Sequence, residues 1–208
     1  MARNLTTVAR VYIPKVFNPL ARLLLRAGVS PNAVTVAGTL GVLVGCLGFV
    51  TRGELLVGTL VVTVSVLTDM LDGAMARVRG TTSKFGAFLD STMDRIADGA
   101  IFGSLAYWLA TTGQDVLAAV ALICLVAGQI VSYAKARAEG LGVSCNVGVA
   151  ERGERLLVIG IGALLNALGV PYVLETALWV LAALAVLTAG QRIAHVYRQT
   201  HIPAESAS

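Results

Sequence analysis

Four aspartates with helical spacing form the most distinctive feature of the sequence. They are Asp69, Asp72, Asp90 and Asp94, and they fall in a stretch that is otherwise apolar enough to span a membrane. A charged side chain near the centre of a bilayer costs roughly 3 kcal/mol on insertion scales. Because that cost applies to each unpaired carboxylate, the pattern predicts a cationic partner that the aspartates share.

The spacing of the aspartates indicates what that partner is. Asp69 and Asp72 lie about 60° apart on one helix, and the second pair lies about 40° apart on the next helix. If these helices are antiparallel and joined near Gly80, both pairs lie at one membrane surface. Clustered carboxylates cannot all ionise without cations, and an all-oxygen ligand set suits magnesium or manganese, two of which would clamp a phosphoryl group. The alternative, helix-end charges solvated at the interface, explains neither the pairing nor the nearby glycines.

The same stretch resembles the signature of the CDP-alcohol phosphotransferase family. The matching positions are Asp69, Asp72, Gly73, Ala76, Arg77, Gly86, Asp90 and Asp94. The resemblance implies that the first three aspartates are metal ligands, whereas Asp94 shares a metal and also acts as the general base. It further implies two divalent ions per active site, Mg²⁺ or Mn²⁺.

The resemblance also implies a set of contacts to the CDP-linked donor. The positions matching Gly73 and Arg77 contact the cytidine diphosphate, and a guanidinium fork suits a diphosphate. Ser83 belongs to the same set, together with a helix start that faces the nucleotide or its phosphates, formed by Pro31, Asn32, Ala33 and Val34. Simpler alternatives are helix packing for Gly73, a cytoplasmic anchor for Arg77 and an N-cap for Ser83.

The composition indicates a membrane protein. Of the 208 residues, 56% are hydrophobic and 13% are charged, and the mean hydropathy of +0.79 lies outside the range of soluble domains. The net charge of +4 comes from basic residues that mostly flank apolar runs. Such residues act as topology signals and phospholipid contacts, so we predict no nucleic-acid partner. Three cysteines imply no disulfide framework, and we predict no removable signal peptide.

The apolar runs predict an all-α integral membrane protein with six transmembrane helices. The runs cover about 33–50, 55–75, 86–110, 116–136, 156–170 and 172–191. The fifth is shorter than the roughly 20 residues that cross a bilayer core. Residues 1–30 mix arginines with apolar residues, which predicts an amphipathic juxtamembrane helix on the cytoplasmic face, the alternative being a flexible basic tail. Residues 31–200 then form one six-helix domain, and 201–208 form a tail.

Basic residues alternate across the breaks between these runs. The N-terminal segment, the second and fourth loops and the C-terminal end are basic, whereas the other loops together contain only Arg52. By the positive-inside rule, both termini face the cytoplasm, and so does the aspartate cluster beside the second loop. The sequence therefore predicts a multi-pass protein of the cell membrane with a cytoplasmic active site.

The second half of the chain carries cations that bear on the acceptor. They are Lys135, Arg137, Arg152, Arg155 and Arg192. Arg155 and Arg192 fall deep enough that an unpaired charge would be costly, so we expect each to face a cavity or a partner. As a set, the cations predict an anion site and an acceptor that itself carries phosphate, the alternative being separate anchoring of each helix end. Asp98, one turn beyond Asp94, is interpreted as a helix-packing or cation-paired residue, with Arg95 as its neighbour.

A narrower resemblance, to the phosphatidylinositol phosphate synthases of actinobacteria, implies an acceptor of this kind. It rests on Ser132, Tyr133, Lys135, Arg137, Ala138 and Glu139, followed by Glu151, Arg152, Glu154 and Arg155. It implies a homodimeric enzyme that transfers the phosphatidyl group of CDP-diacylglycerol to an inositol phosphate and releases CMP.

Two other functions stay open at this point. Phosphatidylglycerophosphate synthases share the core pattern and take glycerol 3-phosphate as their acceptor. A divalent-cation transporter would use the aspartates as a midplane site. Transport needs a site that is reachable from both sides of the membrane, whereas these aspartates lie near one predicted cytoplasmic loop.

Overall fold

Six long helices follow one another in the part of the chain that the structure, a computed structural model, describes: residues 17–80 and 83–201, apart from the side chains of residues 69 and 70. Residues 17–26 are also helical. The six helices are α2 (Pro31–Gly48), α3 (Leu55–Arg79), α4 (Lys84–Thr111), α5 (Asp115–Gly140), α6 (Arg152–Ala167) and α7 (Val173–His201), with the short 3-10 helix η1 (Val50–Arg52) between α2 and α3. No strand occurs in these described ranges.

Local sequence signals set several of the helix ends. The hydroxyl of Ser30 accepts a hydrogen bond from the Ala33 N–H (3.2 Å), with Pro31 at the first helical position of α2. Ser83 caps α4 in the same way, accepting from the Gly86 N–H (2.8 Å). Gly80 ends α3 in the left-handed conformation (φ +70°), which glycine adopts without strain.

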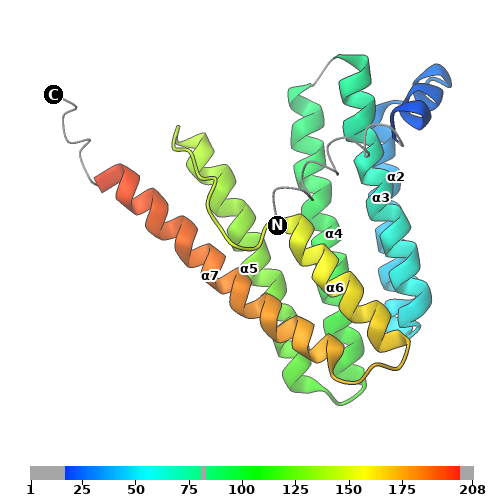
Figure 1. Cartoon of the computed structure of the whole chain (residues 1–208), viewed down its shortest axis with the longest axis vertical. Helices are drawn as coiled ribbons and strands as arrows, with labels where there is room; N and C mark the ends of the chain where they lie inside the picture. Colours follow the sequence, from blue (N-terminus) through cyan, green and yellow to red (C-terminus); the bar gives the residue numbers. More distant parts are fainter. Residues whose placement is uncertain (1–16, 81–82, 202–208) are drawn as a thin grey trace, which may run out of the picture.

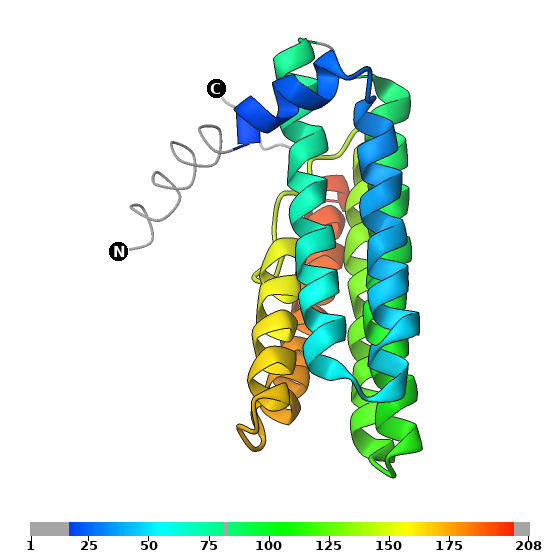
Figure 2. The same ribbon diagram turned by 90° about the vertical axis from the view of Figure 1, so that its right-hand side faces the viewer.

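The helices run up and down past one another (Figures 1 and 2). Helix α2 packs against α3 and α4, α5 packs against α4 and α7, and α6 packs against α3 and α7. Fully buried side chains such as Phe102, Leu109 and Leu178 fill the centre. The starts of α2, α4 and α6 and the ends of α3, α5 and α7 therefore point the same way, but α6 begins well below the upper ends of α3 and α4 (Figure 1).

Four of the described helical segments are long and apolar enough to cross a membrane: Pro31–Arg52, Leu55–Arg79, Asp115–Gly140 and Val173–His201. Their exposed side chains include the apolar residues Val44, Leu60 and Val126, as expected for a surface that faces lipid. Helix α4 has 28 residues, but its first half carries three charged residues of the site, Asp90, Asp94 and Arg95, and α6 has only 16 residues. The all-α character is thus confirmed, with four helices that could cross a membrane, while the count of six spans stays a prediction.

The helix ends extend beyond the predicted apolar runs. Helix α3 reaches Arg79, α5 reaches Gly140 and α7 reaches His201. The hydropathy pattern marks only the part of a helix that lies in hydrocarbon, whereas Arg, Lys and Glu continue a helix readily beyond it.

The helix at residues 17–26 has two unlike faces. Ala21 is fully buried, and Phe17, Leu24 and Leu25 pack beside it against the start of α2 and the end of α3. The side chain of Arg22 is exposed. This helix lies across the upper end of the bundle (Figure 2). The rest of the predicted amphipathic segment, residues 1–16, lies outside the described residues, as does the predicted tail from residue 202.

Candidate active site

Asp72 sits near the end of α3 and is held from α2. Its side chain is buried, and the hydroxyl of Thr35 donates a hydrogen bond to Asp72 Oδ2. Thr35 Oγ1 also lies 3.2 Å from the Pro31 carbonyl in the first turn of α2. The start of α2 is thereby tied to a predicted metal ligand, a link that the sequence analysis missed. The sequence offers no local signal for this link, because Thr35 and Asp72 are 37 residues apart and meet only where α2 packs against α3.

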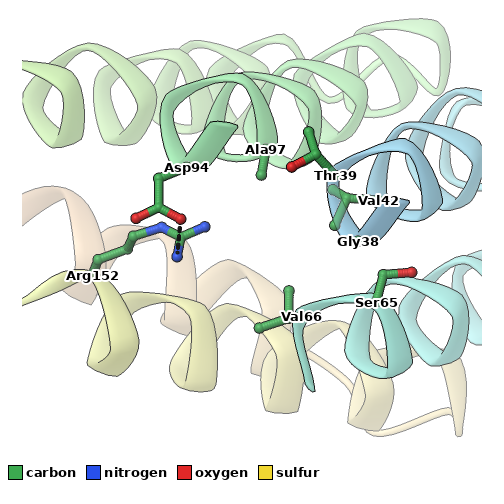
Figure 3. Close-up of a pocket in the computed structure, with 8 residues that line it drawn as sticks. All are labelled: Gly38, Thr39, Val42, Ser65, Val66, Asp94, Ala97 and Arg152. Carbon is green, nitrogen blue, oxygen red and sulfur yellow. Dashed lines mark ion pairs between the residues drawn. The ribbon is translucent and has the colours of Figure 1, made fainter. Parts of the chain in front are cut away.

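Asp94 lies on α4 and faces Arg152, the first residue of α6 (Figure 3). Arg152 Nη1 is 2.6 Å from Asp94 Oδ1, and Arg95 Nη2 is 3.9 Å from Asp94 Oδ2. The Asp94 side chain is 19% exposed, so this ion pair is shielded from most solvent. The two residues border a small cavity whose other walls come from α2, α3 and α4: Gly38, Thr39, Val42, Ser65, Val66 and Ala97.

The aspartates supply carboxylate oxygens that could hold a metal ion. Asp90 is partly exposed and lies one turn before Asp94 on α4. Asp69 is in α3, but its side chain lies outside the described set. Among the described side chains, no three Asp, Glu, His or Cys groups are close enough to share one ion. The chemistry of the donor set nevertheless fits, because carboxylate oxygens are the ligands that hard divalent ions such as Mg²⁺ and Mn²⁺ take.

The predicted donor-contact residues gather where three helix ends meet. A methyl group at Gly86, in the first turn of α4, would lie 3.3 Å from Asn32 Oδ1 at the start of α2. The N-termini of α2 and α4 are therefore neighbours, and the positive end of a helix dipole favours an anion. On α3, Arg77 Nη1 lies 3.5 Å from where a Cβ of Gly73 would be.

The other predicted donor residues differ in how far they are exposed. Ala33 is exposed, whereas Val34 is buried against Leu71 and Met75. The side chain of Val34 thus packs within the protein. Ser83 is the N-cap of α4, so its simpler alternative role is confirmed, and this role does not exclude a donor contact.

Asp98, one turn after Asp94 on α4, forms ion pairs with three arginines. Its carboxylate is 3.1 Å from Arg152 Nε, 3.3 Å from Arg155 Nη2 and 3.7 Å from Arg95 Nη2. The interpretation of Asp98 as a cation-paired residue beside Arg95 is confirmed. The two arginines of α6 were not foreseen as its partners, because 54 and 57 residues separate them from Asp98 and no local spacing relates them.

The arginine cluster is defined here as Arg95, Arg152 and Arg155, and among the described side chains its ion pairs are with two carboxylates, Asp94 and Asp98. Arg155 is only 3% exposed. Within the described part of the chain, its Nε and Nη1 are buried and have no hydrogen-bond partner. Buried donors without an acceptor are costly. The cluster therefore has both the charge and the spare N–H groups to attract an anion.

Arg192 is buried on α7, and its guanidinium donates hydrogen bonds to backbone carbonyls. Its Nε donates to the Val147 carbonyl (2.9 Å) and its Nη1 donates to the Val131 carbonyl (2.5 Å). The nearby Thr188 Oγ1 accepts from the Ala150 N–H (3.3 Å). Arg192 thus has the partner that its depth predicts, and it fastens the segment leading into α6 to α5 and α7.

The remaining two predicted acceptor residues, Lys135 and Arg137, lie near the C-terminal end of α5. Lys135 Nζ is 4.0 Å from Glu139 Oε1 on the same helix. Arg137 is exposed. Of the five predicted acceptor cations, the structure brings Arg152 and Arg155 together on one carboxylate, whereas Lys135 and Arg192 make their described contacts elsewhere and Arg137 is exposed.

Comparison with protein families finds one that matches most of the chain. The sequence profile of the CDP-alcohol phosphatidyltransferase family matches residues 28–190. This range includes all eight positions of the aspartate signature and the basic residues as far as Gly190. Only Arg192, among the predicted site residues, lies beyond it.

Individual relatives have similar lengths and names. A phosphatidylinositol phosphate synthase of Streptomyces avermitilis is 47% identical over 204 residues, which cover 94% of this chain and 84% of the relative. One from Mycobacterium marinum is 47% identical over 194 residues, covering 91% and 83%. Both similarities extend through the helices that carry the site.

Solved structures show the same fold. The crystal structure of Mycobacterium tuberculosis phosphatidylinositol phosphate synthase with CDP-DAG bound superposes with a TM-score of 0.84 at 44% identity, covering 88% of this chain and 94% of that one. A second structure of that enzyme, in complex with manganese and citrate, has the same TM-score and covers 87% and 88%.

Proposed function

Because the chain belongs to the CDP-alcohol phosphatidyltransferase family, we propose that it transfers the phosphatidyl group of CDP-diacylglycerol to an inositol phosphate and releases CMP. Relatives that are 47% identical over nearly the whole chain carry that activity in their names. The structural observation that carries the proposal is the ion pair of Arg152 with Asp94 (2.6 Å), which joins the predicted general base to the arginine cluster. A phosphorylated alcohol bound there has its hydroxyl beside the base.

The donor lies across the membrane surface in this proposal. Its acyl chains stay in the bilayer, and its nucleotide and diphosphate lie at the adjoining starts of α2 and α4. Pro31, Asn32 and Ala33 contribute there with Ser83, and Val34 contributes its backbone because its side chain is buried. From α3, Gly73 allows close approach and Arg77 pairs with the diphosphate. The solved relative with CDP-DAG bound supports this choice of donor.

Divalent metal ions belong to the proposal as resident cofactors. The residues that would hold them are Asp69, Asp72, Asp90 and Asp94, and we propose two ions, Mg²⁺ or Mn²⁺. When bound, they neutralise the diphosphate and stabilise the charge that develops on it. The manganese complex of the Mycobacterium tuberculosis enzyme supports a divalent ion.

The chain's own residues perform the proton transfer. Asp94 accepts the proton of the acceptor hydroxyl, and the oxygen attacks the lipid-bearing phosphorus. A new phosphorus–oxygen bond forms, the bond to CMP breaks, and CMP departs with that electron pair. Arg152, in contact with Asp94, keeps the carboxylate oriented before the acceptor arrives.

The acceptor's phosphate binds the basic side of the site. Arg152 and Arg155 supply the nearest guanidinium groups, and Lys135, Arg137 and Arg192 complete the proposed set. The described contacts favour the first two, because they already converge on Asp98 and because Arg155 Nε and Nη1 are buried with no hydrogen-bond partner among the described residues. This arrangement suits a phosphorylated alcohol better than a neutral one.

The proposed topology follows from the distribution of basic residues among the loops. Six spans place both termini and the active site on the cytoplasmic side of the cell membrane, with α4 and α6 shielded by the four more apolar helices. Residues 1–30 form the juxtamembrane segment, 31–200 the catalytic domain and 201–208 the tail. We propose that the protein works as a homodimer, with no nucleic acid as partner.

The nearest competing function uses glycerol 3-phosphate as acceptor, since it too carries phosphate. CMP release by the purified full chain in detergent separates the two. The assay contains CDP-diacylglycerol and Mg²⁺ and compares inositol phosphate, free inositol and glycerol 3-phosphate. We expect release with inositol phosphate only. Release with glycerol 3-phosphate alone would keep the aspartate chemistry and overturn the acceptor, whereas release with none would revive the transporter alternative.

A further inference from the structure

We infer that Asp98 and Gly128 are positioning residues, which set the orientation of the arginines that receive the acceptor's phosphate. Neither residue belongs to the aspartate signature. The inference rests on the proposed function and adds to it the reason why this site distinguishes a phosphorylated alcohol from a neutral one.

Asp98 is the fixed point of the arginine cluster. It is 3% exposed, and both of its carboxylate oxygens are used: Oδ1 by Arg152 Nε at 3.1 Å and Oδ2 by Arg155 Nη2 at 3.3 Å. Three guanidinium groups packed without this carboxylate would repel one another in a site of low polarity. The charge of Asp98 thus holds the two α6 arginines side by side.

Gly128 shapes the other side of Arg155. It lies on α5, and a Cβ there would overlap Arg155 Nη1 and lie 3.0 Å from Cζ. The obstructing atom is the end of a side chain, so an added methyl group would displace the guanidinium and leave the backbone in place. The missing side chain of Gly128 therefore provides the space in which Arg155 reaches Asp98.

The position of Asp98 on α4 gives this arrangement its consequence. Asp98 lies one turn after Asp94, on the same face of the helix. Arg152 contacts both carboxylates, Nη1 with Asp94 and Nε with Asp98. The distance between the bound phosphate and the base is therefore set by one rigid helix, and alcohols whose hydroxyl and phosphate match that distance are favoured.

The first test is the charge of Asp98. In Asp98→Asn we expect the KM for inositol phosphate to rise about tenfold or more, as expected when hydrogen bonds to a charged group are lost, while the KM for CDP-diacylglycerol changes less than about twofold. Asp98→Glu, which keeps the charge, should recover part of the loss. A parallel rise of both constants, with no recovery in Asp98→Glu, would overturn the positioning role.

The second test is the space at Gly128. Gly128→Ala should raise the KM for inositol phosphate in the same selective way. Gly160→Ala is the matched control, because Gly160 lies on α6 with Arg155 and nothing lies within 4 Å of its added Cβ. Equal effects of the two glycine substitutions would contradict the inference. Since both Asp98→Asn and Gly128→Ala act through Arg155, the double variant should lose less than the product of the two single effects.

A binding measurement separates failure of this inference from failure of the proposed function. Titration of the full chain with inorganic phosphate reports on the arginines without turnover. If wild type releases no CMP with any phosphorylated alcohol, the proposed function fails. The inference still stands in that case if Asp98→Asn and Gly128→Ala each bind phosphate about tenfold more weakly than wild type and Gly160→Ala. Equal phosphate affinity in all four proteins, or none in wild type, would overturn it.

Discussion

The acidic and basic halves of the site are built in different ways. The acidic half comes from one continuous stretch, in which α3 and α4 carry the aspartates at spacings that one helix turn dictates. The basic half brings together arginines of α4 and α6 through the buried carboxylate of Asp98. The first half is therefore visible in sequence, whereas the second exists only after the chain has folded.

The two halves meet at Arg152, and this division assigns each half a substrate. The aspartates and the helix starts around them handle the CDP-linked donor and its metal ions. The arginine cluster handles the phosphate of the acceptor. Changes in the acidic half should therefore affect the chemical step, and changes in the basic half should affect the acceptor's KM.

Removal of divalent metal tests the acidic half most severely. We expect EDTA to abolish CMP release, because the donor's diphosphate then lacks the charge neutralisation that the aspartates hold in place. Dialysis followed by Mg²⁺ or Mn²⁺ should restore it. Unchanged turnover in chelator would contradict the assignment of Asp69, Asp72, Asp90 and Asp94 as metal ligands.

Asp94→Asn should have the next largest effect. We expect kcat to fall about 100-fold or more, the usual contribution of a general base, while binding of CDP-diacylglycerol stays measurable by titration. Asp115→Asn, at the exposed start of α5, is the control and should leave kcat unchanged. Normal turnover in Asp94→Asn would remove Asp94 from that role.

Arg192→Ala tests whether acceptor binding depends on the hydrogen bonds that hold the segment before α6 in place. The substitution removes the side-chain donor to the Val131 and Val147 carbonyls, and so loosens the segment that leads into α6. We expect the KM for the acceptor to rise about tenfold and the KM for the donor to change little. Arg198→Ala, on an exposed turn of the same helix, is the control. An unchanged acceptor KM would show that Arg192 contributes to folding and not to acceptor binding.

Ser83→Ala should have the smallest effect, and on stability more than on chemistry. Loss of the cap leaves the Gly86 N–H without its acceptor, at a cost of about 1 kcal/mol in the free energy of unfolding. Thermal unfolding in detergent measures it, with Ser91→Ala in the middle of α4 as the control. A selective rise in the donor's KM would instead show that Ser83 contacts the donor directly.

The difference between the halves also explains what sequence could predict. The helix start at Pro31, the N-cap at Ser83 and the break at Gly80 follow from local chemistry, and the structure confirms them. The depth of Arg155 and Arg192 predicted that each has a partner. Their partners, Asp98 and two backbone carbonyls, depend on which helices pack together, which no local spacing encodes.

The link from Thr35 to Asp72 and the space at Gly128 could not be predicted from sequence either, because both depend on which helices pack together. Thr35 is one of two threonines in the apolar run 33–50, and its importance appears only because α2 packs against α3. Gly128 is one of 22 glycines in the chain. What distinguishes it is the Arg155 guanidinium that lies against it, brought there from α6.

The most direct measurement of the division of labour is the preference for a phosphorylated acceptor in wild type and in Arg155→Ala. The ratio of kcat/KM for inositol phosphate to that for free inositol is measured in both, with CDP-diacylglycerol saturating. We predict that wild type strongly favours the phosphorylated alcohol and that this ratio falls about tenfold or more in Arg155→Ala, with the donor's KM unchanged. An Arg155→Ala enzyme that keeps the wild-type ratio would contradict the account.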